Sequence, residues 1–239
     1  MKDLSELQAT VTHTAELLSA IHGGVHRIGE IAIRTTASDN QFKLFHQLDA
    51  DLVAQPGHGG LKVFQGPTEA RQISLYAEDG TYRFLKAQRS LRRGWLMVIE
   101  SVGDLRLALD HFYPAALGLW LAHRRGSLEV EDLRHKLDRQ TGMYRRAKML
   151  TDEGAQALVP ATCAAAPGCA RRILWGISPT QPLRPSPASA CMGIAEGVAE
   201  NEAIPLLCAA PCNHFIAECR EAAKQQAPTP PSHAVVSAP

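Results

Sequence analysis

The sequence predicts an α+β protein, and two observations carry this prediction. Segments in which apolar and polar residues alternate as in strands lie before residue 101, whereas helical periodicity dominates after it. Strands followed by helices are typical of α+β folds, since βαβ units would interleave the two patterns. All six cysteines lie between Cys163 and Cys219. We therefore expect a small, mainly antiparallel sheet with helices, followed by a helical, loop-rich domain that holds a cluster of cysteines.

The N-terminal part supplies the predicted sheet. Apolar residues recur at helical spacing over 3–20, and the pair Gly23-Gly24 ends this helix. Residues 26–36 and 41–48 alternate in polarity around the turn sequence "SDN", which predicts a β-hairpin. Further predicted elements are a strand at 61–64, a helix at 67–76, a short strand at 81–86 after the turn "EDG", and a strand at 94–100.

Helical patterns follow from residue 102 onward and define the rest of the chain. We expect helices at 103–114, 115–126 and 129–150, separated by Pro114 and Gly126, then one from Asp152 to Pro160 and one over 212–224. Residues 177–190 are rich in proline and serine, which predicts a loop. The predicted organisation is an α+β stabilising domain (1–142), a cluster-binding domain (143–224) and a disordered tail (225–239).

Composition and motifs exclude several classes of function. The formal net charge of +1 gives no electrostatic basis for binding nucleic acid. No apolar run is long enough to span a bilayer, and the N-terminus lacks the pattern of a secretory signal, so we expect a cytoplasmic protein without a membrane partner. Walker, GxGxxG and GxSxG motifs are absent from the sequence, which argues against the commonest nucleotide-dependent enzymes and hydrolases.

The cysteines form two close pairs. Cys163 and Cys169 have the spacing Cys-x5-Cys, and Cys208 and Cys212 follow about 38 residues later with the spacing Cys-x3-Cys. In a reducing compartment, clustered cysteines are more often metal ligands than disulfides. Four thiolates suit either one tetrahedral zinc ion or a 4Fe-4S cube, and the loose spacings favour the cube, whose irons are further apart. The simplest alternative is that these thiols are small buried side chains.

The predicted start of the last helix adds a physical argument. Pro211 suits the first turn of a helix, so Cys212 is expected where free backbone amides face a negatively charged cluster. Cys219 lies two turns later on the same face and is expected in the core. Cys191 falls in the proline- and serine-rich segment, and His214 is expected to face solvent.

The cysteine segments carry a family resemblance. "QTGMYRRAKMLTDEGAQALVPATC", "GCARRILWGI" and "AIPLLCAAPCNHFIAECR" resemble the iron–sulfur extension of CbiX-type sirohydrochlorin chelatases, proteins of cobalamin and sirohaem biosynthesis. "LRRGWLMVIE" and "YPAALGLWLAHRRGSL" resemble the α+β domain beside it. The resemblance implies that Cys163, Cys169, Cys208 and Cys212 are the ligands of a 4Fe-4S cluster. The chelatase domain has no counterpart here, which implies an accessory or redox role beside a separate CbiX-like chelatase or electron-transfer partner, without catalytic residues of its own.

Three functional hypotheses follow. The first is an iron–sulfur accessory protein, the second a zinc-stabilised interaction module, and the third an enzyme with one reactive cysteine, for which no partner base is evident. Two minor site hypotheses concern other residues. One is a metal site at His22, His26 and His58, which the adjacent glycines disfavour. The other is a tetrapyrrole-binding face formed by Tyr113, Trp120 and His123, although the tryptophans are most simply core residues.

Overall fold

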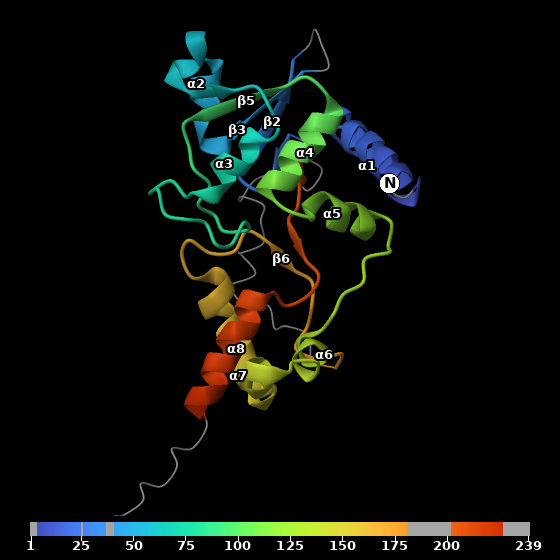
Figure 1. Cartoon of the computed structure of the whole chain (residues 1–239), viewed down its shortest axis with the longest axis vertical. Coiled ribbons are helices and arrows are strands. Elements are labelled where there is room, and N and C mark those ends of the chain that lie inside the picture. The colour runs from blue at the N-terminus through green and yellow to red at the C-terminus, as the bar shows by residue number, and fades with distance from the viewer. Residues whose placement is uncertain (1–3, 25, 37–40, 181–201, 227–239) are drawn as a thin grey trace, which may run out of the picture.

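The computed structural model describes residues 4–24, 26–36, 41–180 and 202–226. Its architecture is α+β, as predicted, with a layered part containing a sheet above a part made of short helices (Figure 1). We call residues 4–124 the sheet region and the described residues from 125 onward the cysteine region. The predicted tail from residue 227 and the predicted loop from residue 181 to 190 lie outside the described residues.

The main sheet has six strands in the order β4-β5-β3-β2-β1-β7. The predicted hairpin of 26–36 and 41–48 is present, with Ile33 opposite Leu44 in an antiparallel pair. The sheet is mixed, because β4 runs parallel to β5 and β7 runs parallel to β1. The strands are β1 (Arg27–Ile28), β2 (Ile31–Thr35), β3 (Phe42–His46), β4 (Lys62–Phe64), β5 (Trp95–Ile99) and β7 (Ala203–Ile204).

Alternation along the strands builds a core on each face of the sheet. Leu44 pairs with Met97 and belongs to the larger core, whereas the next pair, Phe45 and Leu96, belongs to a smaller core. Helices α1, α3, α4 and α5 contribute to the larger core, and α2 contributes Val53 to the smaller one. The helical elements of this region are α1 (Leu4–His22), η1 (Gln47–Asp49), α2 (Ala50–Ala54), η2 (Pro56–Gly60), α3 (Glu69–Leu75), α4 (Val102–Phe112) and α5 (Ala116–Arg124).

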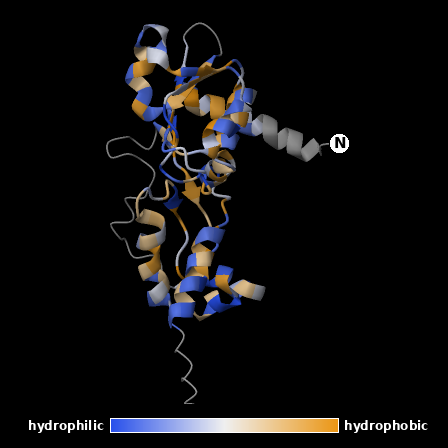
Figure 2. Ribbon diagram, turned by 60° about the vertical axis from the view of Figure 1, so that its left-hand side comes forward, coloured by the Kyte–Doolittle hydropathy of each residue, from blue (hydrophilic) through white to orange (hydrophobic). Residues whose placement is uncertain are grey.

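The cysteine region is built from short helices around a second core. Hydrophobic positions, orange in Figure 2, alternate with hydrophilic ones along these helices. The buried side chains of this core include Trp175 and Phe215, whose ring centroids lie 5.3 Å apart. Two short parallel strands, β6 and β8, pair beside this core. The elements are α6 (Leu133–Asp138), η3 (Gly142–Met149), α7 (Asp152–Val159), η4 (Pro160–Ala164), β6 (Arg172–Ile173), β8 (Leu207–Cys208) and α8 (Asn213–Gln226).

Two predicted elements differ in the structure. The long helix expected over 129–150 is divided into α6 and the 3-10 turns of η3, because Gly142 adopts a φ of +56° that breaks helical geometry. The strand expected over 81–86 is irregular: Tyr82 forms a single bridge with Tyr76, and the backbone just beyond turns to the cysteine region. Local periodicity could not indicate this non-local pairing.

The segment of residues 202–208 contacts both regions. Its first part, β7, extends the main sheet beside β1, and the His26 N–H donates to the Glu202 carbonyl over 2.8 Å. Ile204 and Leu206 are buried in the larger core. Its last part, β8, pairs with β6 and ends at Cys208. The position of this cysteine is therefore fixed by hydrogen bonds to both regions.

Candidate metal centre

The four predicted ligands lie at the ends of short elements of the cysteine region. Cys163 is in η4, a single π-helical segment, and Cys169 lies in the loop before β6. Cys208 is the last residue of β8, and Cys212 directly precedes α8. Cys212 is exposed and the other three are half-buried.

The first pair is held by a tight loop. The Cys169 N–H donates to the Cys163 carbonyl over 2.7 Å, which closes the loop between the two residues. Gly168 makes this closure possible: its φ is +74°, and a Cβ at this position would lie 3.2 Å from the Ala164 carbonyl oxygen. Proximity of these cysteines is thus a property of the local chain.

The backbone of the sheet region forms hydrogen bonds around the second cysteine of this pair. Gln88 forms a β-bridge with Cys169, the Arg89 N–H donates to the Gly168 carbonyl over 3.1 Å, and the Ala170 N–H donates to the Ala87 carbonyl over 2.6 Å. The buried Arg83 guanidinium donates in turn to the Gln88 carbonyl. The sequence did not predict this backbone pairing, because nothing in the pattern of 83–89 indicates a partner about 80 residues away along the chain.

The second pair is placed by β8 and by the start of α8. Cys208 pairs with Ile173 in β6, and its carbonyl accepts the Leu174 N–H over 3.0 Å. Helix α8 begins at Asn213, so Pro211 precedes the helix rather than lying in its first turn. Cys212 then accepts two amides of that turn: Ile216 N–H reaches its carbonyl at 3.0 Å and Phe215 N–H reaches its Sγ at 3.5 Å. The sulfur of Cys212 therefore lies at the amide end of α8.

The surroundings of Cys208 shift the pKa of its thiol. Burial raises the pKa of Cys208 to about 11, and the Trp175 indole N–H, which donates to Cys208 Sγ over 3.3 Å, opposes this rise. The neighbouring thiols of Cys212 and Cys169 raise the pKa further, while the Arg171 cation lowers it. A buried sulfur next to two more thiols suits a bound cation, because a cation favours the thiolates that crowding and burial disfavour. The donor set therefore fits a metal cofactor.

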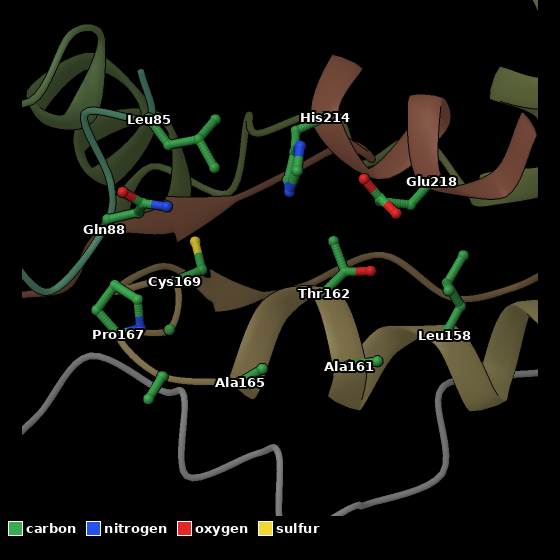
Figure 3. Close-up of a pocket in the computed structure, with 12 residues that line it drawn as sticks. Leu85, Gln88, Leu158, Ala161, Thr162, Ala165, Pro167, Cys169, His214 and Glu218 are labelled. Atoms are coloured by element: carbon green, nitrogen blue, oxygen red, sulfur yellow. The ribbon is translucent and has the colours of Figure 1, made fainter. Parts of the chain in front are cut away.

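The remaining cysteines and His214 differ in their surroundings. Cys219 is fully buried in the second core, as predicted, and burial raises its pKa to about 12. Cys191 lies outside the described residues. His214 is half-buried rather than solvent-facing. It lines a pocket of about 350 Å³ together with Cys169, and Figure 3 shows these two side chains facing the same space from α8 and from the loop before β6.

The other candidate residues mostly belong to the core. Trp95, Trp120 and Tyr113 are buried, and the Tyr113 hydroxyl accepts the Glu30 N–H at 3.0 Å inside the sheet region. Within the described part of the chain, no three His, Cys, Asp or Glu side chains are grouped closely enough to bind one metal ion. A 4Fe-4S cube takes one thiolate per iron, so its ligands are spread more widely than those of a single ion. No helix among the described residues is long and apolar enough to cross a membrane.

Comparison with known families identifies the cofactor. Residues 125–221, which contain all four predicted ligands, match the model of a 4Fe-4S iron–sulfur cluster binding domain. The cofactor is a 4Fe-4S cluster. Residues 13–124 match a second model, the DR2241 stabilising domain, so the two matches divide the chain directly after α5. Zinc is therefore the secondary alternative for these thiolates.

A solved structure shares the architecture of most of the chain. DR2241 from Deinococcus radiodurans, described as a multi-domain protein with structural similarity to chelatases and with two additional novel domains, superposes with a TM-score of 0.67 at 26% identity. The match covers 90% of the chain studied and 42% of DR2241, so our chain spans less than half of that protein's length. No curated protein matches the chain.

Proposed function

We propose that Cys163, Cys169, Cys208 and Cys212 bind the 4Fe-4S cluster. The observation that supports this assignment best is that all four cysteines lie within the matched 4Fe-4S domain, where Cys169 and Cys212 lie close enough to Cys208 to act on its thiol although they come from two distant segments. Cys163 is joined to this group through its backbone bond to Cys169, and both Cys163 and Cys208 pack against the second core. The loop, the strand end and the helix start would each supply ligands to this cluster.

We also propose that the protein is a redox or accessory partner of a CbiX-type tetrapyrrole chelatase. The family resemblance of the cysteine segments supports this role, as does the described chelatase similarity of DR2241. In the shared portion, the sheet region would support the cluster domain, and chelation would take place on other parts of the assembly. The partner would be a separate CbiX-like chelatase, or an electron carrier that exchanges electrons with the cluster.

Anaerobic purification tests the cofactor assignment. We expect about four iron and four sulfide per chain, and a broad absorption near 400 nm that bleaches with dithionite. Colourless protein with one zinc ion per chain would contradict the assignment and support the zinc-stabilised module. Each of the four cysteine-to-serine variants tests a ligand separately, because a hydroxyl oxygen matches iron less well than a thiolate.

Titration against a purified CbiX-type chelatase tests the partner proposal. We expect the cluster-loaded protein to bind this chelatase, and the Cys208→Ser variant, which should lack the cluster, to bind it more weakly. If neither the cluster-loaded protein nor the variant binds the chelatase, but the cluster exchanges electrons with a ferredoxin-type donor, the partner would instead be an electron carrier. Calorimetry and stopped-flow absorption of the cluster band measure these two outcomes.

A further inference from the structure

The indole ring of Trp175 is bound to a proposed cluster ligand. Its Nε1–H donates to Cys208 Sγ at 3.3 Å, and the side chain is only 2% exposed. An indole nitrogen donates and does not accept, so this contact has a fixed polarity: the proton always points to the sulfur. A sulfur that carries more negative charge accepts this bond more strongly.

The surrounding structure holds the indole in this orientation. The ring packs against Phe215 at 5.3 Å between centroids, tilted by 51°. The backbone on either side is anchored, since the Leu174 N–H donates to the Cys208 carbonyl at 3.0 Å and the Gly176 N–H donates to Asp132 Oδ1 at 2.9 Å. The donor is therefore preorganised, and little rearrangement accompanies a change of charge on the sulfur.

A preorganised donor affects the two oxidation states of a cluster differently. Reduction adds one electron, and part of the added charge resides on the ligand sulfurs. A hydrogen bond to such a sulfur stabilises the reduced form more than the oxidised form, which raises the reduction potential. The effect is larger in a dry site than in water, because the local dielectric constant is low. Cys208 borders the second core and meets this condition.

We propose that Trp175 is a positioning residue that raises the reduction potential of the cluster by donating its indole N–H to Cys208 Sγ. This inference rests on the proposed role of Cys208 as a ligand. The backbone N–H of Phe215, which reaches Cys212 Sγ at 3.5 Å, acts in the same sense on the second cysteine of the pair. A side-chain substitution leaves that bond in place, so the contribution of Trp175 can be measured against a constant background.

The test is a redox titration of the full chain with the cluster bound. Trp175→Phe keeps an aromatic ring against Phe215 and removes the N–H. At a fixed solution potential, we expect the ratio of reduced to oxidised cluster to fall about tenfold, equivalent to a midpoint about 59 mV more negative for one electron. Iron and sulfide content should not change. Trp95→Phe is the matched control: it makes the same substitution in the core of the sheet region and should leave the midpoint unchanged.

A second variant removes the donor without altering the shape of the side chain. Benzothienylalanine at position 175 keeps the bicyclic ring and replaces the N–H by sulfur. A midpoint shift that both variants share is therefore due to loss of the hydrogen bond, whereas a shift in Trp175→Phe alone is due to altered packing. Equal midpoints for the wild type and this variant, with clusters present in both, would overturn the role of Trp175. Absence of a cluster from the wild type would instead overturn the proposed function. An unchanged midpoint in Trp175→Phe together with a cluster lost in Cys208→Ser would refute only the tuning role.

Discussion

In the sheet region, strands and four helices bury an extended apolar core, whereas in the cysteine region short helices and 3-10 turns enclose a much smaller one. Among the described residues the larger core has more than twice as many buried members. Hydrophobic burial scales with apolar area, so the sheet region can be stable by itself. The cysteine region buries less apolar area, so its stability should depend on the cluster that joins its distant segments.

Removal of one proposed ligand should produce the largest difference in stability between the two regions. We expect Cys208→Ser to lose nearly all bound iron, and the free energy that cluster binding adds to folding should disappear with it. Hydrogen exchange should then accelerate throughout 125–180 and much less in 13–124. Cys219→Ala and Cys191→Ser are controls that should retain the iron. If Cys191→Ser empties the site while Cys163→Ser does not, the assignment of the first pair is wrong.

A substitution in the sheet region should produce the reverse pattern. Gly29 has a φ of +55°, and a Cβ there would lie 2.7 Å from Cζ of the buried Tyr113 ring. We expect Gly29→Ala to lower the free energy of unfolding of the sheet region by about 3 kcal/mol, from strain and overpacking together. Denaturant unfolding in a Trp175→Phe background, followed by the fluorescence of Trp95 and Trp120, measures this loss.

Gly80 provides the matched control for this substitution. Its φ is +81°, but a Cβ at that position would meet no atom within 4 Å. Gly80→Ala should therefore lower the free energy of unfolding by only about 1 kcal/mol, the cost of the left-handed backbone alone. Equal losses in the two variants would show that the approach of Tyr113 to Gly29 does not contribute.

Arg83 should show that the sheet region also supports the cluster. Its guanidinium donates to the Gln88 carbonyl, next to the backbone that pairs with 168–170. We expect Arg83→Met to release iron to a chelator roughly fivefold faster, equivalent to about 1 kcal/mol of lost support. Stability should change less, because two of the guanidinium nitrogens, Nε and Nη1, have no hydrogen-bond partner in the buried interior. A release rate equal to that of the wild type would contradict the support of Cys169 by Arg83.

The smallest predicted effect is a pH dependence of the cluster-free protein. Burial raises the pKa of Cys219 from 9.0 to about 12, so the folded state retains a proton that the unfolded chain releases above pH 9. The free energy of unfolding should therefore fall as the pH rises, by about 1 kcal/mol at pH 10 from this thiol. Urea titrations at pH 8 and pH 10 measure the slope, which Cys219→Ala should reduce. An equal slope in this variant would assign the effect to other groups.

Sequence patterns predicted many elements of the sheet region, because these patterns depend on residues close together in the chain. Alternating polarity located the hairpin and β5, and helical spacing located α1, α4 and α5, since each pattern reflects one buried face. The pairing of β7 with β1 left no such signal, because two residues form a parallel contact with a strand far away in the chain. The mixed character of the sheet was hidden for the same reason.

The cysteine spacings indicated a metal-binding region but not its surroundings. The two pairs stood out because metal ligands recur at short spacing regardless of the fold. Trp175 was visible only as part of an apolar segment, although its N–H contacts Cys208 across 33 positions of the chain. A single sequence cannot distinguish a buried tryptophan that fills space from one that donates a hydrogen bond to sulfur.

The segment 202–208 should make aggregation of the protein depend on the state of the cluster, because it pairs with β1 at one end and with β6 at the other. Residues of β7 cover the outer side of β1, whose amides and carbonyls otherwise form an open sheet edge. If oxygen destroys the cluster and β8 loosens, β7 loses its anchor and the backbone of β1 becomes available to strands of other molecules. Oxidative damage at a few sulfur atoms would then lead to edge-to-edge aggregation that begins at a sheet with an intact core.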